Sequence, residues 1–547
     1  MGLTNFRNEM TKFGMKRKDR RLHTYIIGKT GTGKSTLLEN MIHDDILEGR
    51  GVAVVDPHGQ LIEHVLKFIP EHRVKDVVYF NAADHDFPMG FNVLENKDLT
   101  PEKKVILTSG VVGVFEKIFG EVSWGPRLEY ILRNVILGLL DYPNATMLGI
   151  MRTLTDNAYR RLVVNEIKDP TVRSFFVDEY EKYEPKFRQE AIAPIQNKVG
   201  QFLSSTLIRN VVGQPVSTIR MDEIMNNGKI LLADLSKGRI GEDNSTLLGS
   251  LLVTQIQLSA MARTEIPEDE RRDFYLYVDE FQNFATGSFA TILSEARKYR
   301  LNLIMAHQYV AQLPEKVRDA VFGNVGTTIT FRINANDATA LQKEFEPIFD
   351  VNDLVNLDNY TVYLKMAIDG VTVPAFSAAT LPPPETQHNF IGEIIDFSRE
   401  NYAKTREDVE EYILDWSAPV DISNMQNKQE KQSDIVTKRE EENSLPKIIE
   451  SGGVGEKKES KTEILKDRFN RNWYAVSGEV ELKPKEEVKS KTEEMIQANQ
   501  SGGEIEKFEQ NDQLITWEKA SELGVNPSEF GTKNKPAYDD YLPIDEL

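Results

Sequence analysis

Residues 28–35 read Gly-Lys-Thr-Gly-Thr-Gly-Lys-Ser, and they follow directly on the apolar run Leu-His-Thr-Tyr-Ile-Ile at 22–27. This is the G-x-x-x-x-G-K-[ST] phosphate loop in its required setting, where a short strand runs into a helix. The glycines let the backbone curl so that successive N–H groups point at one anion, and the helix that follows adds its positive end. The stretch therefore predicts a nucleotide site on an α/β fold.

The residue types in this loop assign separate tasks within a nucleotide site. Lys34 supplies a mobile charge for the β- and γ-phosphates, and Ser35 supplies a hydroxyl for Mg²⁺. The whole loop and the first helical turn are expected to bind the nucleotide through Gly28, Lys29, Thr30, Gly31, Thr32, Gly33, Lys34, Ser35 and Thr36.

Composition narrows the class of protein. The chain has 547 residues, of which 40% are hydrophobic and none is cysteine, so disulfides and thiolate metal sites are excluded. No run of 18 apolar residues and no signal peptide occur, and we therefore expect no transmembrane helix. The histidines show no paired ligand spacing, so Mg²⁺ carried by a nucleotide is the only metal that we expect.

The net charge of −20 is spread unevenly along the chain. From residue 385 onward there are 37 acidic and 22 basic residues, a net charge of −15, which leaves −5 for the first 384 residues. Residues 1–23 carry seven Lys and Arg against two acidic residues. This pattern predicts an acidic tail and, at 1–21, a basic N-terminal arm, either solvated or in contact with an anionic partner.

Apolar strands alternate with helical stretches over most of the first 384 residues. Several predicted strands are nearly all apolar, as strands buried on both faces should be, which favours a largely parallel sheet. Strands are predicted at 22–27, 52–56, 76–80, 229–234, 274–278, 301–306, 327–333 and 360–366, and helices at 59–69, 245–261 and 288–298.

The strand signal disappears between residues 100 and 204, where apolar residues recur at three- and four-residue spacing. We therefore predict an all-α insertion at 100–204 within a core formed by 22–99 and 205–384. One helix is predicted at 385–419. The composition then predicts a mostly disordered acidic linker at 420–511 and a short acidic and aromatic element at 512–547.

A second set of candidate residues lies at the ends of two later strands. Asp279 and Glu280 follow the apolar run 274–278, where Asp279 is expected to hold Mg²⁺ and Glu280 to polarise the attacking water. We expect this strand to neighbour the strand of the phosphate loop. Gln308 follows the run 301–306 and is placed to sense a γ-phosphate or orient water. Arg297 lies between these strands, where the pattern alone favours a surface charge on a helix over a role in catalysis. Asp56 and His58 close another strand in a turn.

These motifs resemble the coupling ATPases of type IV secretion and conjugation, within the wider group of HerA- and FtsK-like DNA translocases. The resemblance rests on 28–35, 55–59, 278–283, 306–308 and 331–334, and it extends over about residues 20–380. It implies a RecA-like core with an inserted all-α domain. It further implies a homo-hexamer around a DNA channel, with ATP and Mg²⁺ bound between subunits.

The resemblance also implies roles for particular residues. Arg297 matches the arginine that acts in the site of the next subunit, and Gln308 matches the glutamine of the family. Arg332 and Arg239 are lesser candidates for contacts between subunits. The family usually has N-terminal transmembrane helices, and none precedes this phosphate loop. We therefore expect a cytoplasmic protein that a partner recruits to the inner face of the membrane.

The sequence thus predicts an ATP-hydrolysing DNA translocase, the coupling ATPase that delivers DNA to a secretion or conjugation channel. Its expected partners are DNA, a relaxase and the membrane channel. Three alternatives stay open on the sequence: a HerA-like DNA-processing translocase, a secretion-assembly ATPase that acts on protein, and a nucleotide-gated docking protein whose acidic tail recruits partners.

Overall fold

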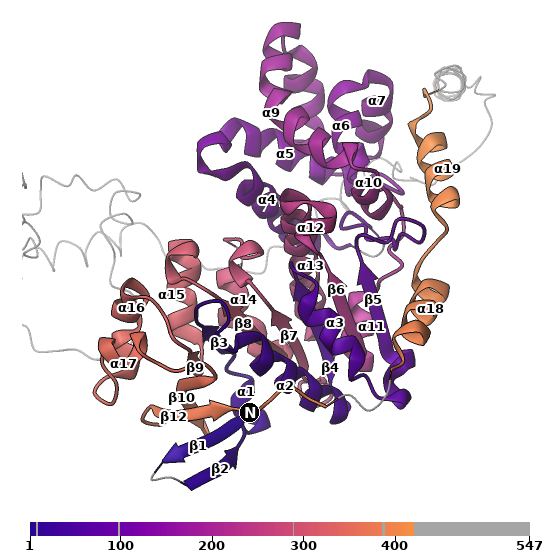
Figure 1. The fold of residues 1–547 in the computed structure, drawn as a ribbon. Coiled ribbons are helices and arrows are strands. Elements are labelled where there is room, and N and C mark those ends of the chain that lie inside the picture. The colour runs from indigo at the N-terminus through magenta and orange to yellow at the C-terminus, as the bar shows by residue number, and fades with distance from the viewer. Residues whose placement is uncertain (7–8, 97–98, 288, 386–388, 421–547) are drawn as a thin grey trace, which may run out of the picture. The chain divides into compact units, whose positions relative to one another are not determined.

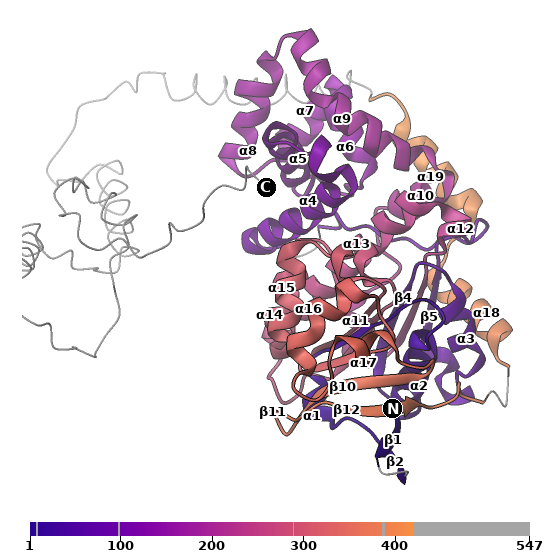
Figure 2. The same ribbon diagram turned by 60° about the vertical axis from the view of Figure 1, so that its left-hand side comes forward.

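The computed structural model describes residues 1–6, 9–96, 99–287, 289–385 and 389–420. Within them, twelve strands form one sheet in the order β2-β1-β12-β10-β9-β3-β8-β7-β4-β6-β5, with β11 beside β10 (Figures 1 and 2). The predicted RecA-like α/β fold with a largely parallel sheet is confirmed. The linker predicted at 420–511, apart from its first residue, and the element predicted at 512–547 lie outside the described residues.

Seven neighbouring strands form the parallel part of the sheet. The phosphate-loop strand β3 lies between β8 and β9, and β7 lies between β8 and β4. The strands are β3 (Thr24–Ile27), β4 (Gly51–Asp56), β5 (Val77–Asn81), β6 (Ile230–Asp234), β7 (Phe274–Val278), β8 (Leu301–His307) and β9 (Thr327–Thr330).

An antiparallel part extends the sheet beyond β9. It consists of β10 (Thr361–Ile368), β11 (Val371–Thr372), β12 (Phe376–Thr380), β1 (Gly2–Phe6) and β2 (Glu9–Phe13). Residues 1–21 are therefore not the basic arm that the charge pattern predicted. Within this segment, β1 pairs with both β2 and β12, and the short helix α1 (Arg17–Arg20) follows β2.

The two faces of the parallel strands enter two separate cores. Val52 and Val54 of β4 join the core that contains α2 (Lys34–Leu47) and α3 (Gln60–Lys67). Ala53 and Val55 join the other core, which contains α13 (Glu242–Met261) and the helical insertion. Because successive residues of a strand face opposite sides, the nearly continuous apolar runs reflect burial on both faces.

The region predicted as an all-α insertion is helical in the structure and gathers to one side of the sheet (Figures 1 and 2). Its first helix packs against α13. The helices are α4 (Pro101–Ser123), α5 (Pro126–Leu139), α6 (Leu148–Thr155), α7 (Asn157–Glu166), α8 (Pro170–Ser174), α9 (Pro185–Ser204) and α10 (Thr206–Val212).

The remaining helices connect and cover the strands. They are α11 (Met221–Asn227), α12 (Lys237–Ile240), α14 (Phe289–Glu295), α15 (Glu315–Asn324), α16 (Ala335–Phe345) and α17 (Val351–Val355). The single helix predicted at 385–419 is instead two, α18 (Ile391–Tyr402) and α19 (Arg406–Ser417). Ala403–Thr405 separate them, and Thr405 accepts a hydrogen bond from Asp408 N, as a helix N-cap does.

One stretch, Glu242–Glu265, is long and apolar enough to cross a membrane by length and composition. Of its most apolar window, 67% is buried inside the protein, as in a core helix. It comprises α13 and the turn after it, and α13 packs between the sheet and α4.

Several basic residues of the N-terminal segment form ion pairs with carboxylates elsewhere in the chain. Arg20 is buried and forms an ion pair with Asp45, whose carboxylate also accepts from Arg50 at 2.8 Å and from Tyr277 Oη at 2.5 Å. Arg21 pairs with Asp273 at 2.8 Å. Because these partners are distant in sequence, the charge pattern of residues 1–21 alone predicted a basic arm.

Replacement of Asp45 by asparagine is expected to lower the free energy of unfolding by about 3–5 kcal/mol, because the Arg20 charge would remain buried without its counterion. Thermal unfolding followed by circular dichroism measures the change. The matched control is Asp44→Asn, an exposed neighbour on the same helix, for which we expect about 0.5 kcal/mol or less. Equal melting temperatures for the two variants would contradict a structural role for the Asp45 cluster.

Candidate nucleotide site

The phosphate loop occupies the turn between the end of β3 at Ile27 and the start of α2 at Lys34. Gly31 and Gly33 have φ angles of 76° and 116°, which side chains rarely tolerate. A Cβ atom at Gly33 would also lie 2.8 Å from the ring of Tyr360. The glycines are therefore required both by the backbone and by the aromatic side chain packed against the loop.

Backbone hydrogen bonds fix the loop to the neighbouring part of the sheet. Lys29 N donates to Arg332 O at 2.9 Å, just after β9. Tyr360 N donates to Thr32 O at 2.8 Å, just before β10. The loop is held in shape by the protein itself, as a preformed anion site should be.

Lys34 lies buried beneath the loop. Its Nζ donates to Gly28 O at 2.7 Å and to Lys29 O at 3.1 Å. Burial lowers the pKa of Lys34, and the charges of Glu280 and Asp279 oppose that shift. Ser35, in contrast, is exposed in the first turn of α2. The phosphate loop thus places the Lys34 ammonium group and the exposed Ser35 hydroxyl on adjacent residues.

Asp279 follows the last residue of β7 and is also buried. Burial, together with the nearby charges of Asp56 and Glu280, raises the pKa of Asp279 to about 7. The predicted position of this strand was wrong in one respect, because β8 lies between β3 and β7. Strand order in space does not follow order along the chain, and apolar patterns do not encode it.

Glu280 is held by two amide side chains. Gln308 Nε2 donates to Glu280 Oε1 at 2.6 Å, and Gln282 Nε2 donates to Oε2 at 2.7 Å. Glu280 itself has φ of 47°, an uncommon backbone conformation for glutamate. The sequence predicted Glu280 and Gln308 separately. It gave Gln282 no role, although an amide two residues beyond a candidate carboxylate was a usable signal.

The strand end between these groups contributes a buried neutral histidine. His307, the last residue of β8, contacts the hydroxyl of Tyr25 on β3 through Nε2. Burial, with a smaller contribution from the Lys34 charge, lowers the pKa of His307 to about 3. The imidazole is therefore neutral at physiological pH and links the phosphate-loop strand to the strand that carries Gln308.

Two further sequence candidates have mainly local contacts. Asp56 accepts from His58 N at 2.7 Å and from Leu61 N at 2.9 Å, so its carboxylate serves the start of α3. His58 is exposed. The charge of Asp56 nevertheless acts on the site, because it contributes to the raised pKa of Asp279.

The candidate arginines do not join this cluster within one chain. Arg297 is exposed in the turn just before β8 and contributes its charge near the buried His23, which precedes β3. Both positions lie at the strand starts, the sheet edge opposite to the phosphate loop. Arg332 lies beside the loop and donates to Asn359 Oδ1 at 2.9 Å, and Arg239 pairs with Glu63 at 3.3 Å.

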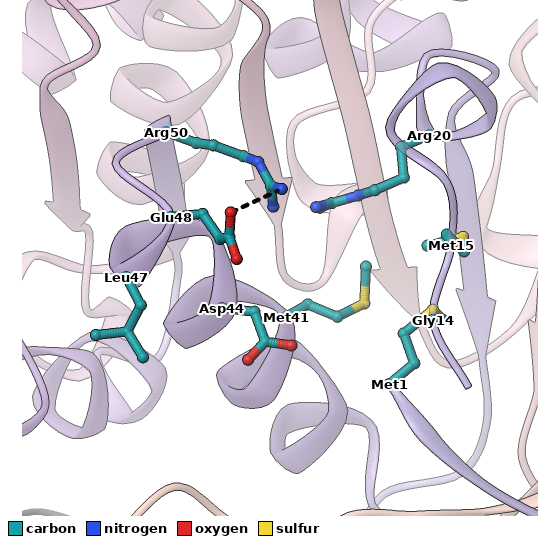
Figure 3. A pocket seen from close by; sticks show the side chains of 9 residues that line it. All are labelled: Met1, Gly14, Met15, Arg20, Met41, Asp44, Leu47, Glu48 and Arg50. Atoms are coloured by element: carbon teal, nitrogen blue, oxygen red, sulfur yellow. Dashed lines mark ion pairs between the residues drawn. The ribbon is translucent and has the colours of Figure 1, made fainter. Parts of the chain in front are cut away.

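A cavity of about 370 Å³ lies elsewhere, at the far end of α2 (Figure 3). Since α2 has 14 residues, its two ends are about 21 Å apart. The lining consists of Met1, Gly14, Met15, Arg20, Met41, Asp44, Leu47, Glu48 and Arg50. This cavity borders the Asp45 cluster and takes no part in the nucleotide site.

The residues present fit a nucleotide-bound Mg²⁺. Among the described residues, no group of three or more His, Asp or Glu side chains is arranged to hold a metal by itself. The raised pKa of Asp279 indicates a buried carboxylate that a cation would stabilise, and the Ser35 hydroxyl is open. Together with nucleotide phosphates, these two groups would supply the oxygen ligands that Mg²⁺ prefers.

Known proteins of similar fold include a bacterial coupling protein. The unbound structure of the conjugative coupling protein TrwB, as TrwBdeltaN70, matches with a TM-score of 0.51 at 15% identity, over 71% of this chain and 92% of that chain. This chain has the fold of a conjugative coupling protein. TrwB with the GTP analogue GDPNP gives 0.51 at 16% identity, and TrwB with ADP and Mg²⁺ gives 0.50 at 16%. Each covers 68% of this chain and 89% of its own.

A family model also matches part of this coupling-protein fold. Residues 273–343 match the model described as the TraM recognition site of TraD and TraG. That segment runs from the start of β7 into α16 and contains Asp279, Glu280, Arg297 and Gln308. No curated protein matches the sequence.

Proposed function

We propose that this protein is an ATP-hydrolysing DNA translocase, the coupling ATPase that delivers DNA to a conjugation or type IV secretion channel. The observation that supports the reaction most directly is the contact of Gln308 with Glu280, near the buried side chains of Lys34 and Asp279. These are the groups that phosphoryl transfer to water requires: a cation for the phosphates, a carboxylate for the metal and a base for the water.

Each side chain has a defined task in this proposal. Bound Mg²⁺ would supply charge neutralisation at the phosphates, with Asp279 and Ser35 as its protein ligands. Lys34 would exchange its two loop carbonyls for phosphate oxygens. Glu280 would accept a proton from the attacking water, with Gln308 orienting Glu280 and sensing the γ-phosphate.

Arg297 is proposed to complete the site of a neighbouring subunit. It lies at the sheet edge opposite to its own phosphate loop, so a catalytic role requires another chain to be placed against that edge. A ring of six subunits, as in the proposed homo-hexamer, would bring one subunit's Arg297 toward the next subunit's nucleotide and stabilise the developing charge.

The proposed partners follow from the family match and the fold. The segment 273–343 is the part that resembles a TraM recognition site, so we propose that a TraM-like or relaxase component of the DNA-processing complex binds near it. We propose a cytoplasmic protein, recruited to the inner face of the membrane through the channel.

DNA is expected to stimulate ATP hydrolysis by the full chain several-fold at low salt, with the stimulation falling as salt rises, because the contacts are to backbone phosphates. Steady-state phosphate release with single-stranded DNA, double-stranded DNA and no DNA measures this. Polyglutamate, a polyanion without nucleotides, is the control. Hydrolysis that responds to neither DNA, or equally to polyglutamate, would reject the translocase function and favour an ATPase acting on protein or as a switch.

A further inference from the structure

One lysine of the helical insertion contacts the turn that carries the candidate base. Lys117 lies on α4, and its Nζ donates to Gln282 O at 2.8 Å and to Ala285 O at 2.6 Å. The two acceptors belong to the segment that follows Glu280 directly. Lys117 therefore links the insertion to the nucleotide site through a single side chain.

The surroundings of this ammonium group are unusual for a structural lysine. Its two acceptors are neutral carbonyls, and among the described residues it forms no ion pair with a carboxylate. Burial lowers the pKa of Lys117 to about 8. A methionine or leucine would fill the same space without a desolvated charge, so space-filling alone does not explain a lysine here.

The turn after Glu280 is held from several sides as one unit. Lys237 of α12 donates to Asn283 Oδ1 at 3.0 Å, and Ser250 of α13 donates to Phe284 O at 3.4 Å. A Cβ atom at Gly249 would lie 2.1 Å from the Phe284 ring, so α13 packs tightly against the turn. Lys117 is the contact to this turn that comes from α4, on the side of the insertion.

Gln282 lies between Lys117 and the candidate base Glu280. Its carbonyl accepts from Lys117, and its side-chain amide donates to Glu280 Oε2 at 2.7 Å. A displacement of α4 would shift the Gln282 backbone, and with it the amide that orients one oxygen of the Glu280 carboxylate. Two hydrogen bonds therefore separate the insertion from the candidate base.

We propose that Lys117 is a positioning residue for Glu280, through which the helical insertion sets the rate of ATP hydrolysis. The proposal rests on the proposed function, because it assumes that Glu280 activates water. It assigns Lys117 no contact with nucleotide or metal. Loss of Lys117 should therefore alter the rate of the chemical step and leave nucleotide binding unchanged.

The test is ATP hydrolysis by the full-length variants Lys117→Met and Lys117→Arg. We expect Lys117→Met to lower kcat roughly tenfold with an unchanged KM for ATP, as for the loss of an interaction made in the transition state. Lys117→Arg should retain most of the rate, because arginine also donates to two carbonyls. Lys103→Met, on the same helix but in an exposed ion pair with Glu265, is the matched control and should behave as the wild type.

A double-mutant cycle separates positioning from general damage. If Lys117 acts through Gln282, Lys117→Met combined with Gln282→Ala should be no slower than Gln282→Ala alone. Additive losses, a wild-type rate for Lys117→Met, or a fall in kcat matched by a lower melting temperature would each overturn the proposal. A wild-type protein that does not hydrolyse ATP would instead refute the proposed function itself.

Discussion

Replacement of Lys34 by alanine is expected to lower ATP hydrolysis roughly 100-fold or more, in line with the loss of one preorganised donor at a developing charge. Lys34 is the cation buried beneath the phosphate loop, and within the described part of the chain its ammonium donates to the carbonyls of Gly28 and Lys29. Phosphate oxygens are stronger acceptors than carbonyls for a charged donor. Nucleotide affinity should fall as well, because the β- and γ-phosphates lose their buried counter-charge.

The control is Lys67→Ala, which removes an exposed lysine on α3 outside the phosphate loop. The rate of this variant should stay close to that of the wild type. Phosphate release and fluorescent-nucleotide titration measure the two effects. Equal activity of Lys34→Ala and the wild type would show that hydrolysis occurs elsewhere or comes from a contaminant.

The sequence predicted those parts of the site that are local in the chain. The apolar run 274–278 placed β7 correctly, since the strand is Phe274–Val278. The glycines and Lys34 needed only the eight residues of one motif. In both cases the physical cause, burial on two faces or a backbone turn, acts within a few residues of the pattern that reveals it.

Features that depend on distant partners were missed or misplaced. The charges of Arg17, Arg20 and Arg21 suggested an exposed basic arm, yet their partners Asp45 and Asp273 lie elsewhere in the sequence. The N-terminal hairpin pairs with β12, and nothing in residues 1–21 identifies that partner. The charge pattern of a segment gives the sign of its net charge. It does not show whether those charges pair with carboxylates elsewhere in the fold.

The separation of Arg297 from Glu280 and Gln308 in the fold also could not be predicted from their positions along the chain. Position along the chain, between β7 and β8, places Arg297 near Glu280 and Gln308 in sequence. A parallel connection, however, returns the chain to the opposite sheet edge before the next strand begins. A residue just before β8 is therefore far from the residue just after it, and the role proposed for Arg297 requires a neighbouring subunit.

Replacement of Glu280 by glutamine is expected to lower kcat by about 10²- to 10⁴-fold while ATP still binds, because a general base is lost and the phosphate contacts are not. The amide has almost the shape of the carboxylate and keeps one oxygen to accept from Gln282 or Gln308. It cannot take a proton from water. Single-turnover hydrolysis together with nucleotide titration separates the two steps.

The effect of Glu280→Gln should be specific to this carboxylate. Glu315→Gln removes a carboxylate that lies on the surface and forms an ion pair with Arg318 at 3.3 Å, so the rate should be unchanged. If Glu280→Gln weakened ATP binding as much as it slowed hydrolysis, Glu280 would belong with Asp279 in holding the metal and nucleotide. Full activity would exclude it as the base. Retained binding with lost turnover is the outcome that we expect for a general base, because the hydrogen bonds that hold the Glu280 carboxylate come from the side-chain amides of Gln282 and Gln308.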